Sequence, residues 1–154
     1  SLYAAVLKHI TQIDAERDEE QLRAENDPWL AIQLYLDIRT AFIIKYHNLL
    51  EHLQTFAVNN IPKELESVFS FLKQREMARI TYIIEKGKQS RLFKIKDVKK
   101  AAELYYDFLE GFRYASFNPK PNFFPDKKQF QAILKREKEY SVIFFNGLSC
   151  KNDF

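Results

Sequence analysis

Residues that favour turns are scarce in this chain. Only three of its 154 residues are glycine and five are proline, too few for the tight turns of an all-β fold. The single cysteine, Cys150, excludes an internal disulfide and a multi-cysteine zinc site, which favours a reducing compartment. No stretch approaches the ~18 uninterrupted apolar residues of a membrane span, and the first residues lack the layout of a signal peptide. We therefore expect a cytoplasmic protein that does not enter a membrane.

The chain also lacks an excess of charge. Its 24 lysine and arginine residues are balanced by 21 aspartate and glutamate residues, which gives a formal net charge of +3. Domains that bind nucleic acid are usually much more basic, so we do not expect this chain to contact DNA by itself. Apolar side chains are abundant, because 46% of the residues are hydrophobic and 15% are aromatic. This composition predicts one domain over residues 1–154 with a single hydrophobic core.

Apolar residues recur every three or four positions along most of the chain, which predicts an all-α fold of about six helices. The expected helices cover residues 1–24, 28–47, 49–58, 63–86, 97–112 and 126–148. Asp27 and Pro28 are typical of an N-cap followed by the first helical position. Gly87 is expected in the left-handed conformation just after a helix ends, and Asp97 as the N-cap of the next helix.

Arg39 stands out in the second expected helix, which is apolar around most of its circumference. Its position on the helix is close to Tyr35 and away from the polar stripe, so its charge points into the core and needs a partner. Glu76 falls within the apolar stripe of the fourth expected helix. One interpretation is a buried ion pair between Arg39 and Glu76. The other is a mostly apolar pocket in which Arg39 orients a carboxylate or another polar group of a ligand.

The aromatic side chains of the central helices either fill the core or line that pocket. Buried tyrosine hydroxyls need hydrogen-bond partners, and a cavity with polar contents supplies them. The pocket interpretation predicts a small, largely apolar effector. Its candidate ligand-binding residues are Trp29, Tyr35, Arg39, Phe42, Tyr46, Phe69, Glu76, Tyr82 and Tyr105.

Patterns typical of catalysis or of metal binding are missing. His47 and His52 point to different sides of a helix, so they do not chelate a metal ion together. The sequence has no glycine-rich phosphate loop, no nucleophile elbow and no paired cysteine and histidine. We therefore predict no catalytic residue, no metal site and no cofactor. A small cofactor-independent enzyme would instead need a pocket with a perturbed acid or base.

The end of the last helix carries adjacent apolar residues, Val142 to Phe145, so at least one of them must point outward. We interpret this excess as a face for a second copy of the chain, formed by the last two helices. The alternative is that the excess packs beneath the proline-rich loop through Phe117, Phe123 and Phe124. The candidate dimer residues are Tyr105, Phe108, Phe112, Tyr140, Ile143 and Phe144.

Residues 84–113 resemble the ligand-binding half of TetR-family transcriptional regulators. In that family a glycine closes one helix, a phenylalanine ends the turn, an acidic residue opens the next helix and a second glycine follows an apolar stripe. Gly87, Phe93, Asp97 and Gly111 hold these places here. The turn differs from the family pattern, because Arg91 replaces a frequent glycine.

The resemblance implies a repressor with two parts: an N-terminal helix-turn-helix domain, absent from this chain, and a C-terminal domain that binds an inducer and forms a homodimer. Residues 1–24 then form the connecting helix, and residues 97–148 form the dimerisation helices. DNA is contacted only through the absent domain, and the effector changes the separation of two DNA-reading heads. The rival function is a stand-alone helical interaction or scaffold domain without a ligand.

Overall fold

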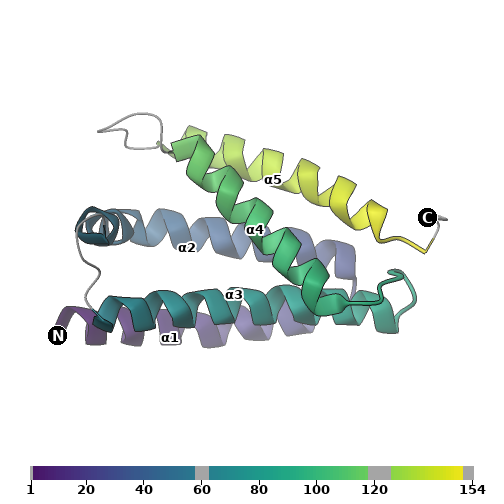
Figure 1. The fold of residues 1–154 in the computed structure, drawn as a ribbon, viewed down its shortest axis with the longest axis horizontal. Coiled ribbons are helices and arrows are strands. Elements are labelled where there is room, and N and C mark those ends of the chain that lie inside the picture. The colour runs from purple at the N-terminus through teal and green to yellow at the C-terminus, as the bar shows by residue number, and fades with distance from the viewer. Residues whose placement is uncertain (1, 58–62, 118–125, 151–154) are drawn as a thin grey trace.

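Five α-helices form the described part of the chain in the computed structural model (Figure 1). The structure describes residues 2–57, 63–117 and 126–150, and it describes side chains over 5–46, 63, 66–116 and 126–150. The helices are α1 (Leu2–Ala24), α2 (Pro28–Ala57), α3 (Lys63–Gln89), α4 (Val98–Phe117) and α5 (Lys127–Gly147). The predicted all-α fold is confirmed. Within the described ranges, no helix combines the length and the apolar character needed to cross a membrane.

The helix α2 accounts for the difference between six expected helices and five observed ones. A break near His47 was expected, but α2 continues without interruption to Ala57. Residues 29–57 contain no glycine or proline, so nothing in their backbone chemistry ends the helix earlier. The sequence also allowed the apolar end of the last helix to pack beneath the proline-rich loop. The side chains named for that alternative, Phe117, Phe123 and Phe124, lie outside the described residues.

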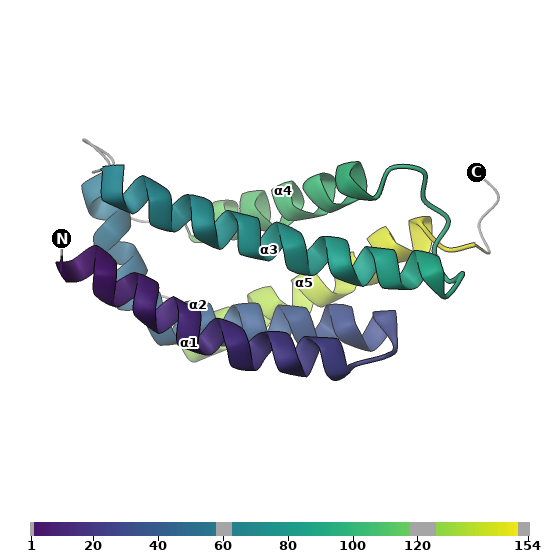
Figure 2. The same ribbon diagram turned by 90° about the horizontal axis from the view of Figure 1, so that it is seen from below.

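The helix α2 also occupies the centre of the bundle, because it contacts α1, α3 and α5. The remaining helix, α4, packs on α3 and α5 and crosses diagonally in front of α2 in Figure 1. Figure 2 shows α1 running beside α2, with α3 on the side of α4. The main core contains buried side chains from all five helices, whereas Leu7 of α1 and Val68 of α3 form a second, smaller cluster.

Aspartate side chains cap the starts of three helices. The backbone N–H of Trp29 donates to the Asp27 carboxylate at 2.9 Å, and that of Lys100 donates to Asp97 at 3.0 Å, as predicted from the sequence. At the start of α5, Asp126 and Gln129 form a reciprocal capping box. These caps fix where α2, α4 and α5 begin.

The turn between α3 and α4 differs from its prediction at Gly87. This residue lies inside α3 and does not have a positive φ, so its expected role as the left-handed residue is wrong. Arg91 takes that conformation instead, with φ of 61°. Gly87 is needed for space, because a Cβ atom there would overlap the ring of buried Phe93. The backbone N–H groups of Leu92 and Phe93 both donate to the carbonyl of Gly87, which closes the turn over the glycine.

The same turn is joined to the chain that follows α5. Phe93 forms an isolated antiparallel bridge with Ser149. The N–H of Lys94 donates to the carbonyl of Leu148 at 2.8 Å, and the N–H of Cys150 donates to the carbonyl of Leu92 at 3.1 Å. The α3–α4 junction is therefore anchored to the end of α5.

Substitution of Gly87 by alanine tests this packing. We expect Gly87→Ala to lower the free energy of unfolding by about 1–3 kcal/mol, the usual cost of overpacking a filled core, measured by chemical denaturation. Gly147→Ala is the matched control, since a Cβ at that helical position meets no atom of the other described residues within 4 Å, apart from the backbone of its own helix. The control should change stability by less than about 1 kcal/mol. Equal effects of the two substitutions would contradict the steric role of Gly87.

Candidate functional site

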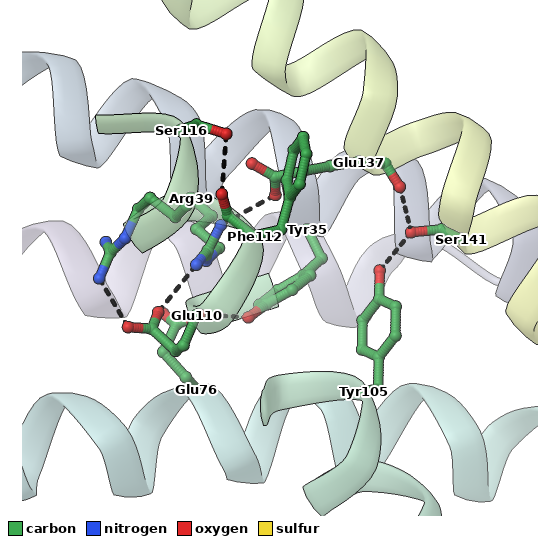
Figure 3. Close-up of polar contacts among 10 residues, drawn as sticks. Tyr35, Arg39, Glu76, Tyr105, Glu110, Phe112, Ser116, Glu137 and Ser141 are labelled. Atoms are coloured by element: carbon green, nitrogen blue, oxygen red, sulfur yellow. Dashed lines mark hydrogen bonds and ion pairs between the residues drawn. The ribbon is translucent and has the colours of Figure 1, made fainter. Parts of the chain in front are cut away.

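The buried guanidinium of Arg39 joins three helices. Its Nη1 donates to the Glu137 carboxylate of α5 at 2.9 Å, and its Nη2 donates to the Glu110 carboxylate of α4 at 2.8 Å (Figure 3). Arg39 and Glu137 are 5% and 3% exposed. A buried ion pair at Arg39 was predicted correctly, but Glu76 as its direct partner is wrong. Glu137 is on α5, which packs on α2, and it reaches Arg39 instead.

Electrostatic partners keep this cluster charged in spite of its burial. Burial by itself lowers the pKa of Arg39, but the neighbouring Tyr35, Glu137 and Glu110 outweigh that effect and raise the pKa above its ordinary value. Burial raises the pKa of Glu137, whereas Arg39 acts in the opposite direction by favouring the carboxylate. Each ion therefore depends on its partner to remain ionised in the core.

Tyrosine hydroxyls extend the cluster on both sides (Figure 3). The Tyr35 hydroxyl donates to the Glu76 carboxylate of α3. On the other side, the Tyr105 hydroxyl lies 2.5 Å from Oγ of Ser141, and this Oγ donates to the backbone carbonyl of Glu137 at 2.6 Å. Polar contacts thus continue from α3 through α2 to α4 and α5 inside an otherwise apolar core.

A cleft of about 430 Å³ lies beside this network, between α2, α3 and α4. Its walls combine aromatic and aliphatic side chains with several charged ones. This size is within the usual range of sites for small organic molecules, and the lining is more highly charged than in most of them. The lining residues are Arg39, Phe42, Ile43, Phe69, Ser70, Leu72, Lys73, Arg75, Glu76, Tyr106, Glu110 and Arg113.

Four of the predicted ligand-binding residues line this cleft. They are Arg39 and Phe42 from α2, and Phe69 and Glu76 from α3. The structure therefore brings together the two charged candidates and two of the aromatic ones. Arg39 is not free to bind a ligand's carboxylate, however, because two of its nitrogen atoms already donate to carboxylates of the protein.

The other five predicted residues lie away from the lining of the cleft. Tyr35 and Tyr105 are completely buried in the core. The ring of Trp29 packs edge-on against Phe93, with 5.8 Å between the ring centroids. The guanidinium of Arg23 lies over the Tyr82 ring. These four aromatic residues follow the interpretation of a packed core.

Tyr46, the fifth, connects α2 to α1. Its hydroxyl donates to the Asp14 carboxylate at 2.5 Å, and Nζ of Lys45 donates to the same carboxylate at 3.1 Å. The hydrogen bond from Tyr46 lowers the pKa of Asp14, burial opposes it and Lys45 reinforces it. The side chain of Asp14 is therefore held in its ionised form at the α1–α2 contact.

The most informative cleft residue that was not predicted is Arg75. Its Nη1 donates to the backbone carbonyl of Thr11 in α1 at 3.0 Å, and its guanidinium lies 5.1 Å from the centroid of the Phe42 ring. Its Nε is buried and has no hydrogen-bond partner among the described residues. The sequence held a signal for it, because Arg75 follows Leu72 by three residues and precedes Arg79 by four, a helical spacing.

Glu137 was also not predicted, and its sequence signal is of the same kind. It follows Phe130 by seven residues and Leu134 by three, which places it on the apolar stripe of α5. All three side chains are buried. A charged residue at such a position needs a buried partner.

The predicted dimer residues of α4 and α5 form a row of aromatic rings. Phe112 stacks on Phe108, Phe108 on Tyr140, and Tyr140 contacts Phe144, with ring centroids 5.9, 3.2 and 6.0 Å apart. These four rings, here called the aromatic row, are all half-buried. Ile143 is 72% exposed, which confirms that the adjacent apolar residues of α5 cannot all face the core.

The side chains that commonly bind metal ions are dispersed in the described part of the structure. No group of three or more histidine, cysteine, aspartate and glutamate side chains there is arranged to hold a metal ion. His9 is exposed, and the side chains of His47 and His52 lie outside the described residues. The cleft instead offers directed charges and apolar walls, which suit binding.

Comparison with known proteins finds the same fold in a solved structure. No protein-family model and no curated protein matches the chain. The solved structure of a transcriptional regulator from Cytophaga hutchinsonii is similar, with a TM-score of 0.77 and 21% sequence identity. The alignment covers 96% of this chain and 75% of that one. The likeness therefore establishes an all-α fold shared with a transcriptional regulator.

The ion cluster predicts a strongly asymmetric response to mutation. We expect Arg39→Met to lower the free energy of unfolding by about 3–5 kcal/mol, because Glu137 is then left as a buried charge without its partner. The double variant Arg39→Met/Glu137→Leu should recover most of that loss, since both charges are gone. Denaturant titrations of the two variants and of Glu137→Leu alone complete the cycle. A double variant as unstable as Arg39→Met would contradict the buried-charge explanation.

The contact between Asp14 and Tyr46 predicts a dependence on pH. Because the pKa of Asp14 is lowered by folding, its contribution to stability is present above the ordinary value of about 3.9 and is lost as the pH falls through the folded value. We expect Asp14→Asn to be less stable than the wild type at pH 6 and the difference to shrink towards pH 2. Thermal unfolding across this range measures it. A carboxyl titration by NMR should also show a higher Asp14 pKa in Tyr46→Phe, and an unchanged pKa would contradict the assigned cause.

Proposed function

We propose that this chain is the effector-binding and dimerisation domain of a TetR-like transcriptional repressor. The observation that carries the proposal is the cleft between α2, α3 and α4, found in a fold shared with a transcriptional regulator. The resemblance of residues 84–113 to the TetR family supports the same function. No enzymatic step is part of the proposal.

The cleft supports the binding of a small molecule. Its volume of about 430 Å³ is within the usual range for organic ligands. Phe42, Ile43, Phe69 and Leu72 provide an apolar wall. The fixed ions around Arg39 add a polar part to the same lining, so a ligand with one apolar part and one polar part fits both.

The surface of α4 and α5 supports the binding of a second copy of the chain. Ile143 of α5 and Leu104 of α4, which is 52% exposed, present apolar side chains to solvent on the two helices that share the aromatic row. Covering such residues against the same face of a partner is the usual reason for a two-fold dimer. Tyr105 is left out of the proposed interface, because its side chain is completely buried in its own protomer.

The first helix supports a link between the cleft and a DNA-binding part. Arg75 lines the cleft and also donates to the carbonyl of Thr11 in α1. An effector that contacts Arg75 therefore acts on a side chain that holds α1 in place. In the proposed repressor, α1 is the connecting helix, and a helix-turn-helix domain attached to it contacts DNA.

Native mass spectrometry tests the proposed assembly. We expect the wild type to have twice the mass of one chain, and Ile143→Lys to be monomeric with an unchanged far-UV circular dichroism spectrum. Leu30→Lys on α2 is the matched control, because Leu30 is also an exposed apolar residue, at 50%, but lies outside α4 and α5, and this variant should stay dimeric.

Native mass spectrometry also distinguishes the proposed function from the rival one, a scaffold domain without a ligand. In the proposed function, addition of small amphipathic compounds gives a dimer with bound ligand. A monomeric wild type that takes up no compound overturns the proposal. A dimer that takes up none supports the scaffold.

A further inference from the structure

The charges lining the cleft are not balanced. Four cationic side chains and two carboxylates line it: Arg39, Lys73, Arg75 and Arg113, with Glu76 and Glu110. Ion pairs in a half-enclosed site are more favourable than at an open surface, so the pairing of each group decides what the cleft can bind. The chemistry of the ligand follows from the cations that no carboxylate neutralises.

The two carboxylates are already committed to other groups. Glu110 binds Arg39 through one oxygen and Arg113 through the other, at 2.8 and 2.6 Å. Glu76 accepts the Tyr35 hydroxyl and lies 3.7 Å from Nη1 of Arg79. Glu110 is therefore neutralised by two arginines, whereas Glu76 shares Arg79 with Glu19, which lies 2.7 Å from Nε of Arg79.

Two of the cations have no such partner. Among the described residues, neither Lys73 nor Arg75 has a carboxylate within ion-pair distance. Lys73 and Arg75 instead lie over the rings of Tyr106 and Phe42, at 5.8 and 5.1 Å from the ring centroids. Lys73 is exposed and hydrated, whereas Arg75 is half-buried.

Arg75 is the cation that gains most from a counter-ion. Burial lowers its pKa, and the positive charge of nearby Arg79 lowers it further, while the carboxylates of Glu76, Asp18 and Glu19 offset these effects only in part. Its buried Nε has no hydrogen-bond partner among the described residues. A negatively charged group beside this guanidinium in the cleft would offset these unfavourable effects.

We propose that the cleft binds an amphipathic monocarboxylate; this inference rests on the proposed effector-binding function and names the class of effector. The carboxylate pairs with Arg75, with Lys73 adding attraction from the rim. The apolar body of the ligand packs against Phe42, Phe69 and Leu72, which line the same cleft. Arg39 shapes the polar wall without accepting the ligand's charge, because Glu110 and Glu137 already neutralise it.

Three simple probes separate the parts of this inference. Decanoate carries the charge and the apolar body, decanamide keeps the body without the charge, and acetate keeps the charge without the body. Titration calorimetry of the wild-type protein should show that decanoate binds about tenfold or more tightly than decanamide, as a charge-assisted hydrogen bond allows. Acetate should show no measurable binding, because it lacks the apolar body.

The variants assign the selectivity to Arg75. Arg75→Gln should reduce the affinity for decanoate to that for decanamide and leave decanamide unchanged, whereas Arg75→Lys should keep part of the preference. Lys88→Gln, at an exposed position near the end of α3, is the matched control and should behave as the wild type. An equal loss for both probes in Arg75→Gln would mean that Arg75 only anchors α1, and would overturn its role.

The outcomes also distinguish this inference from the proposed function. Equal binding of decanoate and decanamide by the wild type, or binding of neither, overturns the inference that the ligand is a monocarboxylate. A protein that binds neither but remains a dimer and takes up another class of compound keeps the proposed function. A monomer that takes up no compound overturns both.

Discussion

The pairing of one buried guanidinium with two carboxylates is the constraint on which the rest of this structure depends. Arg39 in the central helix bonds to Glu110 of α4 and to Glu137 of α5. The buried charges of Arg39 and Glu137 are tolerated only while they remain together. The cluster therefore fixes how α4 and α5 are placed against α2, a relation that apolar packing alone leaves more permissive.

Because of this constraint, Arg39 and Arg75 have different roles at the cleft. Arg39 forms a rigid, neutralised wall, since both of its bonded nitrogens face carboxylates of other helices. Arg75 is bonded to the backbone of α1 and has a buried nitrogen without a partner among the described residues. The residue with the more conspicuous position in the sequence, Arg39, is thus structural, whereas Arg75 lines the cleft without a carboxylate within ion-pair distance among the described residues.

Each end of the bundle is secured by a different kind of contact. At the α3–α4 turn, the absence of a side chain at Gly87 lets the Phe93 ring pack against the helix, and backbone hydrogen bonds join the turn to the residues after α5. Along α1, polar contacts accompany the buried Leu7 and Leu22, including those of Asp14 with Tyr46 and of Arg75 with Thr11.

The sequence by itself determined the helices and their inward faces, because apolar spacing and the caps at Asp27 and Asp97 act within one helix. It also determined that the charge of Arg39 must be buried and paired. Only the tertiary structure decided that Glu137 is the buried partner, that Gly87 makes room for a ring, and that Arg75 lines the cleft. Helical periodicity tells which side of a helix is buried. It does not tell which helix lies opposite, and these contacts join residues whose helices meet only in the folded bundle.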